Sequence, residues 1–318
     1  MTTGAQAVVD AGGAELTRIM DRVEQRMSEL AIGHGPVLGR HAGDTISAGG
    51  KRLRPLLVCL AAGAPPPETA GLVRAAVAVE LVHGATLVHD DVLDGSALRR
   101  GRPTVVATGG RSAATATGDL LFSRAFAELA GGGSPDSVRV LARAARELAL
   151  GELTQREDAY RLDVTVARYL ARCRLKTAVL FRAACELGAL ESGGEPEVLG
   201  AFGERIGLAF QILDDVLDVS GPPERTGKPR GADLLDGTVT LPLILARERG
   251  LEVDLRDVHT TDDAAAVCDR IVATGALDDA RCRGQELVAD AKLGLPVLPL
   301  RQRDALELAA DVMVERYA

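Results

Sequence analysis

One acidic pentapeptide, DDVLD, occurs twice in the chain, at 90–94 and at 214–218. Positions i and i+4 lie on one face of a helix, so Asp90 shares a face with Asp94, and Asp214 with Asp218. Carboxylates this close together repel one another and resist burial. A hard divalent cation removes both problems, because Mg²⁺ takes oxygen ligands from carboxylates and from substrate phosphates. The sequence therefore predicts two metal-binding helix ends that face each other and hold a phosphorylated substrate between them.

A single DDxxD motif can also be no more than a solvated helix end, and for one copy the two interpretations are about equally good. The repetition weakens the solvated interpretation, because each copy ends a long apolar run. The first run, 81–89, contains no acidic residue, lysine or arginine, and the second run, 206–213, contains no charge at all.

Basic residues gather beside both acidic motifs and after the glycine pair Gly49–Gly50. They are Lys51, Arg52, Arg54, Arg99, Arg100, Arg102, Lys176 and Lys228. Arginine and lysine beside glycine-rich backbone suit phosphate oxygens. For Arg52, Arg102 and Arg230 we prefer the simpler interpretation of ordinary surface charge.

The elements that must position these groups are helices, because apolar residues recur at helical spacing and no run alternates as a strand would. We expect an all-α protein that forms one domain over residues 1–318. The expected helices cover 14–32, a segment ending near 62, 69–94, 112–130, 136–157, 163–190 and 194–220, with short helices from 241 onward. Residues 1–13 are expected to be disordered. Residues 221–240 are rich in Gly, Pro and charge and too long for an ordinary connection, which indicates a mobile lid.

Composition narrows the class of protein further. Hydrophobic residues make up 47% of the 318 residues, which is enough for a sizeable core, and a net charge of −8 argues against nucleic-acid binding. Five cysteines without a CxxC spacing indicate reduced thiols in a cytoplasmic protein. The N-terminus does not resemble a signal peptide, and we expect no membrane span. Peripheral contact with a membrane stays open.

The ordered motifs GGKRLRP, HDDVLDGSALRRGRPT, GELTQ, KTA, GLAFQILDDVLD and TGKPRGADLLDGTVTLP resemble those of the trans-isoprenyl diphosphate synthases, also called polyprenyl synthetases. The resemblance covers roughly residues 40 to 245, and more weakly the C-terminal tail. It implies a single large helical bundle around a central cavity, usually a homodimer. It also implies three Mg²⁺ ions and head-to-tail condensation of isopentenyl diphosphate onto an allylic diphosphate.

The resemblance also implies a role for each matching residue. Asp90 and Asp94, supported by Asp91, would bind metal on the allylic diphosphate, and Asp214 would bind a further ion with Asp215 and Asp218 close by. The residues that would hold isopentenyl diphosphate are Lys51, Arg54, His83 and Arg100. Those that would hold the allylic diphosphate are Arg99, Lys176, Thr177, Gln211 and Lys228. Glu152 and Gln155 match a position that faces the cavity.

Product length depends on the residues below the first motif. Each added isoprene buries five carbons, worth on the order of 4 kcal/mol at roughly 0.8 kcal/mol per carbon, so steric hindrance must stop growth. In the family, bulky aromatics five or four residues before the first aspartate give short products, and here Ala85 and Thr86 are small. With Leu81 further down, this indicates a medium- to long-chain product of about 35 to 50 carbons. A geranylgeranyl or farnesyl product is the alternative.

Three other classes remain in view. His83 and His89 allow an HD-type metal phosphohydrolase, which would leave the second DDVLD and GGKRLRP unexplained. A class I terpene cyclase is disfavoured by the duplicated motif and the basic residues. A non-catalytic subunit of a heteromeric synthase is disfavoured because both acidic motifs are intact.

Overall fold

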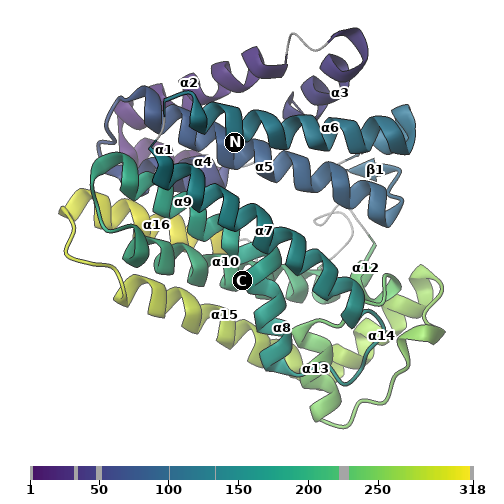
Figure 1. The fold of residues 1–318 in the computed structure, drawn as a ribbon. Helices are drawn as coiled ribbons and strands as arrows, with labels where there is room; N and C mark the ends of the chain where they lie inside the picture. The colour runs from purple at the N-terminus through teal and green to yellow at the C-terminus, as the bar shows by residue number, and fades with distance from the viewer. Residues whose placement is uncertain are drawn as a thin grey trace. The chain divides into compact units, whose positions relative to one another are not determined.

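The computed structural model describes residues 3–31, 35–47, 52–99, 101–132, 134–221 and 229–315. Within them helix follows helix, and the expected all-α fold is confirmed (Figure 1). Contacts divide the chain into two compact units. The first contains Met1–Ala145, Leu180–Gly203 and Leu295–Ala309, and the second contains Arg146–Val179, Glu204–Gly294 and Ala310–Ala318. The expectation of one domain over the whole chain stays a prediction.

The first unit is built from helices and one short hairpin. Its helices are α1 (Thr3–Gly12), α2 (Ala14–Ala31), α3 (Gly35–Ser47), α4 (Leu53–Ala62), α5 (Ala70–Asp94) and α6 (Val105–Ala130). It also takes in the beginning of α7 (Pro135–Asp158) and α10 (Pro196–Ser220), and most of α9 (Val179–Ser192) and α16 (Leu300–Glu315). Between α5 and α6 the strands β1 (Leu98–Arg99) and β2 (Arg102–Pro103) pair antiparallel. This hairpin corrects the expectation of a chain without strands.

Helix α5 is the core helix of the first unit, and α6 packs along it (Figure 1). Residues 75–79 of α5 are fully buried. This stretch consists of Ala and Val and has no polar face, and a helix that is apolar all round is stable only in a protein interior. Thr69 caps its start by accepting a hydrogen bond from the Leu72 amide at 3.1 Å. Gly95 ends it in the left-handed conformation, with φ 63°. The last turn of α5 is therefore the first DDVLD motif.

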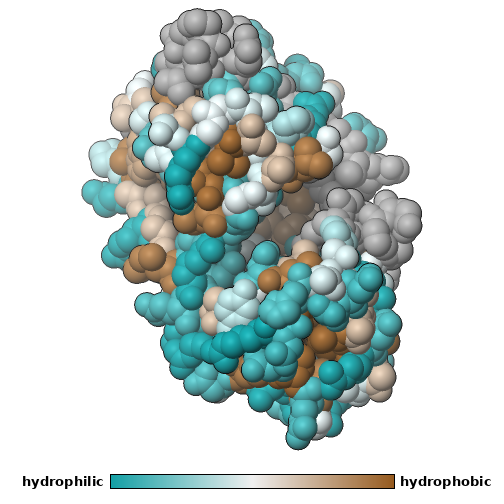
Figure 2. Space-filling model, turned by 90° about the vertical axis from the view of Figure 1, so that its right-hand side faces the viewer, coloured by the Kyte–Doolittle hydropathy of each residue, from teal (hydrophilic) through white to brown (hydrophobic). Residues whose placement is uncertain are grey.

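Length and composition alone would let α5 cross a membrane, and no other helix in the described part of the chain passes that test. Every such window of α5 contains Glu80, so the expectation that no stretch approaches a membrane span without a charge or a break is not contradicted. Of the most apolar window of α5, 67% is buried inside the protein, which is the behaviour of a core helix. On the face drawn in Figure 2, hydrophobic patches alternate with hydrophilic residues among the coloured atoms.

The second unit contains the C-terminal part of α7 and most of α10. Its other elements are α8 (Val166–Cys173), the π-helix η1 (Arg174–Ala178), α12 (Ala232–Leu235), α13 (Leu241–Glu248), the 3₁₀ turn η2 (Leu255–Asp257), α14 (Thr261–Ala273) and α15 (Ala276–Leu293). Leu208, Ile212 and Val216 recur every four residues on α10 and belong to one buried cluster with Tyr169 of α8. This cluster fixes the helix that carries the second DDVLD motif.

The structure corrects several expected boundaries. Residues 3–12 form α1 with Val8 and Val9 buried, so the expectation of disorder is wrong there. Helix α3 was not predicted, and the expected helix 163–190 is divided by η1. Helix α6 begins at Val105 rather than at 112, with a kink at Gly110. Within the expected lid, 222–228 lie outside the described residues, while 232–235 form α12; closure of a lid stays a prediction.

Candidate active site

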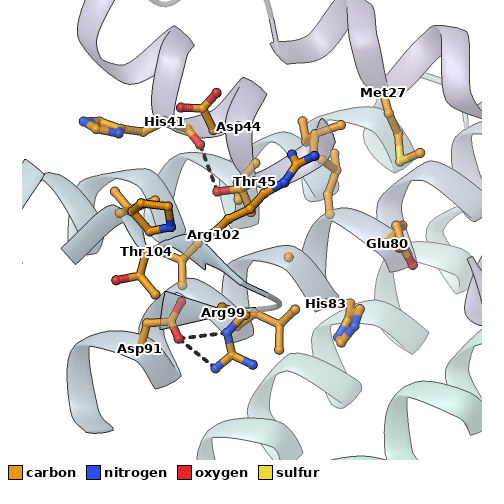
Figure 3. A pocket seen from close by; sticks show the side chains of 18 of the residues that line it. Met27, His41, Asp44, Thr45, Glu80, His83, Asp91, Arg99, Arg102 and Thr104 are labelled. Carbon is orange, nitrogen blue, oxygen red and sulfur yellow. Dashed lines mark hydrogen bonds and ion pairs between the residues drawn. The ribbon is translucent and has the colours of Figure 1, made fainter. Parts of the chain in front are cut away.

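The first DDVLD motif ends α5, and its second aspartate is held by the hairpin that follows. Arg99 Nε on β1 donates to Asp91 Oδ1 at 2.8 Å, and Arg99 Nη2 lies 2.8 Å from the same oxygen (Figure 3). Asp91 is 5% exposed, and burial raises the pKa of its carboxyl although Arg99 opposes the shift. Asp90 is half-buried and Asp94 is exposed. The i, i+4 pair thus stays accessible to ligands, while Asp91 fixes the hairpin.

A cavity of about 310 Å³ lies within the first unit, bordered by α2, α3, α5, α6 and the hairpin (Figure 3). From α5 it is lined by Glu80, Leu81, His83, Gly84, Leu87, Val88 and Asp91. Asp90 and Asp94 are not among its lining residues. The cavity therefore lies beside the first motif and not against the face that is predicted to bind metal.

The second DDVLD motif lies within α10, and here too the second aspartate is held. Tyr169 Oη donates to Asp215 Oδ2 at 2.6 Å, and Gln211 Nε2 donates to Asp215 Oδ1 at 2.7 Å. Asp215 is buried, and burial raises its pKa to about 7 although both hydrogen bonds oppose the shift. Asp214 is half-buried. Asp218 is 2% exposed and accepts the Asp233 amide at 3.2 Å at the start of α12.

Lys176 and Thr177 sit on η1, the π-helical turn between α8 and α9. Lys176 Nζ lies 2.5 Å from Glu152 Oε2 on α7, and Arg156 Nε donates to Glu152 Oε1 at 2.8 Å. Burial raises the pKa of Glu152, but these two cations outweigh it and the pKa falls below its usual value. A Cβ at Gly151 would lie 2.6 Å from the backbone nitrogen of Lys176, so α7 approaches η1 closely only because a glycine stands there. Single π turns of this kind are frequent at functional sites.

The family model for polyprenyl synthetases matches residues 36–272. The chain belongs to the polyprenyl synthetase family. It is 44% identical over 259 residues to the heptaprenyl diphosphate synthase component 2 of Geobacillus stearothermophilus, covering 77% of this chain and 81% of that one. It is 37% identical over 283 residues to the geranylgeranyl diphosphate synthase of Methanosarcina mazei, covering 85% and 87%.

A crystal structure of polyprenyl synthase from Caulobacter crescentus, complexed with calcium and isoprenyl diphosphate, superimposes with a TM-score of 0.90. It is 36% identical, and the match covers 99% of this chain and 98% of that one. The chain is therefore a trans-polyprenyl diphosphate synthase, a prenyltransferase. Like its family it uses a divalent metal and isoprenyl diphosphate substrates. The HD-type phosphohydrolase is excluded with it.

Arg52, in the GGKRLRP segment of this polyprenyl synthetase, differs from the expectation of ordinary surface charge. Arg52 is 10% exposed in its side chain and bridges two helices, with Nε 2.5 Å from Glu24 Oε1 and Nη1 2.9 Å from Glu80 Oε1. Its backbone is left-handed, with φ 50°. The interpretation of Arg52 as surface charge is therefore wrong. The guanidinium of Arg54 stacks over the Phe181 ring at 4.6 Å.

The remaining predicted contacts divide into two groups. Within the first unit, His83 and Arg99 line the same cavity. Within the second unit, Thr177 Oγ1 donates to Gln211 Oε1 at 2.6 Å, so two predicted contacts of the allylic diphosphate lie together. Lys51, Arg100 and Lys228 lie outside the described residues. The roles of all these residues in substrate binding stay predictions.

The structure separates the three residues predicted to control product length. Leu81 lines the cavity, whereas Ala85 is fully buried without lining it, and Thr86 is half-buried. His89 faces α6, where its Nε2 lies 3.3 Å from the Thr115 carbonyl oxygen and its ring stacks on Phe122. This contact accounts for His89 as a structural residue.

Sequence reasoning did not find Tyr169, and it placed Asp215 close to the second metal without showing that Tyr169 and Gln211 hold its carboxylate. The chain contains only three tyrosines, and a tyrosine at an apolar position of a helix could have indicated a buried hydroxyl that needs a polar partner. Its partner Asp215 was hidden by its own motif, because DDVLD does not show which aspartate turns inward.

The residues present fit a metal shared with substrate. No group of three or more His, Cys, Asp or Glu side chains in the described ranges is arranged to enclose an ion. Mg²⁺ usually binds through one or two carboxylates and completes its shell with phosphate oxygens and water. Asp90 and Asp94, accessible and one turn apart, match that donor set.

Proposed function

We propose that this polyprenyl synthetase acts as a cytoplasmic homodimer with three Mg²⁺ ions and condenses isopentenyl diphosphate head-to-tail onto geranyl, farnesyl or geranylgeranyl diphosphate. One observation carries the proposal. In each DDVLD motif the second aspartate is buried and held by side-chain donors, while the first is only half-buried. Each motif thus pairs one anchored carboxylate with an accessible one, which suits a helix end that must hold metal and diphosphate without moving.

The chemistry requires no protein nucleophile. The C–O bond of the allylic diphosphate breaks, and the electron pair leaves with the diphosphate. The isopentenyl double bond then attacks the allylic cation, and the proton lost from the product passes to the released diphosphate. Bound Mg²⁺ supplies charge neutralisation for that leaving group.

The side chains of the second unit supply the rest of this environment. Thr177 and Gln211 are already joined by a hydrogen bond. Lys176 lies on the same π turn as Thr177 and is held there by Glu152. The Lys176 cation, fixed before the substrate arrives, stabilises a developing negative charge without reorganising. We assign Lys176, Thr177 and Gln211, with Lys228, to the allylic diphosphate, and Lys51, Arg54, His83 and Arg100 to isopentenyl diphosphate.

We further propose a product of about 35 to 50 carbons. Ala85 and Thr86 are small at the positions where the family uses aromatic side chains to stop growth, as the sequence motif indicated. The two curated relatives differ in product by name, heptaprenyl in one and geranylgeranyl in the other, so similarity alone does not choose between them.

The test is incubation of the purified chain with Mg²⁺, labelled isopentenyl diphosphate and each allylic starter in turn, followed by sizing of the dephosphorylated products. We expect linear all-trans products and no turnover without an allylic starter. Removal of Mg²⁺ by EDTA should abolish turnover. Cyclic products from the allylic substrate alone would contradict the proposal.

A second candidate function is a synthase that works only with a partner subunit. It is favoured by the name of the relative from Geobacillus stearothermophilus, which is one component of its synthase. Inactivity of the purified chain, relieved by a second polypeptide, would support this candidate over the homodimer.

A further inference from the structure

Four side chains of the second unit form a continuous run of hydrogen bonds. It begins at Tyr169 on α8, passes through Asp215 and Gln211 on α10, and ends at Thr177 on η1. The three donor–acceptor distances are 2.6, 2.7 and 2.6 Å. Tyr169 is fully buried, so its hydroxyl requires a partner inside the protein.

The chemistry of the run gives it one direction. A carboxylate only accepts hydrogen bonds, so Asp215 accepts one from Tyr169 on Oδ2 and one from Gln211 on Oδ1. The Gln211 amide must therefore present its nitrogen to Asp215 and its oxygen to Thr177. The hydroxyl hydrogen of Thr177 is then committed to Gln211. The orientation of both predicted diphosphate contacts is thus set from Asp215, and Asp215 is held from Tyr169.

The local fold brings the two ends of this run together. Tyr169 and Thr177 are eight residues apart, and in an unbroken α-helix such residues would lie about 80° apart around the axis. The π turn Arg174–Ala178, which contains Thr177, adds a residue to one turn of the helix. It thereby reduces the angle between Tyr169 and Thr177 around the axis. Both side chains can then bond to α10.

Other contacts keep Tyr169 itself in place. The Arg172 guanidinium lies 5.6 Å from the centre of its ring, and Arg172 Nη1 lies 3.3 Å from the buried Asp158. The ring thus packs against a side chain that is fixed elsewhere in the second unit. The hydroxyl of Tyr169 provides its hydrogen bond to the acidic motif.

We propose that Tyr169 is a positioning residue for the allylic diphosphate, acting through Asp215 to fix the Gln211 amide and the Thr177 hydroxyl. This inference rests on the proposed function, which assigns Gln211 and Thr177 to that diphosphate. Tyr169 touches no substrate. Its loss leaves the isopentenyl site intact and loosens the allylic site.

The test is Tyr169→Phe, which keeps the ring and removes the hydroxyl. We expect KM for the allylic diphosphate to rise about tenfold, the effect of losing one hydrogen bond to a charged group, while KM for isopentenyl diphosphate stays within about twofold. Equilibrium binding of a non-reactive allylic thiolodiphosphate should weaken by the same factor. The matched control is Tyr160→Phe, which removes a hydroxyl from a 37% exposed tyrosine of the same unit and should change neither constant.

A double-mutant cycle separates positioning from a general loss of structure. Combined with Thr177→Val, Tyr169→Phe should add little, because the run is already broken at its far end. Additive effects, or equal rises in both KM values, would overturn the inference. If Tyr169→Phe does not fold, Asp215→Asn takes its place; an unchanged allylic KM in that variant would overturn the inference as well. Absence of condensation by the wild-type chain would instead refute the proposed function.

Discussion

At the scale of single residues, identical pentapeptides are used in different ways. In both motifs the second aspartate is buried, but Asp91 pairs with an arginine and Asp215 with a tyrosine and a glutamine. The last aspartates differ more, because Asp94 is exposed whereas Asp218 is buried at the start of α12. The two motifs therefore share a buried second aspartate and differ in its partners and in the exposure of the last aspartate.

Asp90 should matter more for catalysis than Asp218. Asp90→Asn removes a half-buried carboxylate predicted to bind metal, and we expect kcat to fall about 100-fold or more, as loss of several kcal/mol of charge stabilisation implies. Asp218→Asn keeps an oxygen that can accept the Asp233 amide, so we expect a fall of less than about tenfold. Steady-state kinetics at saturating Mg²⁺ would show the difference, and equal losses would refute it.

Asp215 should leave a signature in the pH dependence of stability. Its pKa is about 7 in the folded protein, against about 3.9 for an unfolded aspartate. A raised pKa means that the folded state binds the proton more tightly, so the contribution of Asp215 to stability is fully present below about pH 4 and is lost as pH rises towards 7. Urea unfolding of the metal-free protein should show this loss, at most about 4 kcal/mol, and Asp215→Asn should lack it. A difference between the two proteins that does not vary with pH would contradict the assignment.

At the scale of elements, the sequence predicted most helices because apolar spacing is a local property. The helices 14–31, 70–94, 135–158 and 196–220 agree with expectation to within about two residues. The π turn and the short hairpin escaped prediction, since both depend on packing that no local pattern encodes. Arg52 was misjudged for the same reason: its partners Glu24 and Glu80 come from other helices.

The contact between α7 and η1 gives a test at this scale. Gly151→Ala would place a Cβ 2.6 Å from the backbone nitrogen of Lys176. We expect this substitution to lower the free energy of unfolding by about 1–3 kcal/mol and to weaken binding of the allylic diphosphate. Gly84→Ala is the matched helical control, because the nearest atom to its Cβ would be 3.7 Å away. That variant should be neutral or more stable by up to about 1 kcal/mol. Thermal and urea unfolding would compare them, and equal stabilities would contradict the close-approach argument.

At the scale of the whole molecule, each compact unit carries and supports one acidic motif. The first DDVLD is held by a hairpin of its own unit, and the second by α8 of its own unit. The sequence could identify the motifs and the chemistry they suit. It could not show that the supporting contacts are local to each unit, because Arg99 and Tyr169 stand 8 and 46 residues from the aspartates they hold.

Product length depends on the whole path of the growing chain through the molecule. Ala85 and Ala78 are seven residues apart on α5, so they lie on nearly the same face, about two turns and 10 Å from each other. Both are fully buried. If the growing chain runs along this face, Ala85→Phe should shorten the product, and Ala78→Phe should allow a longer one than Ala85→Phe does. Chromatography of the dephosphorylated products, with circular dichroism to verify folding, would measure this. Folded variants with unchanged product lengths would contradict a tail path along this face of α5.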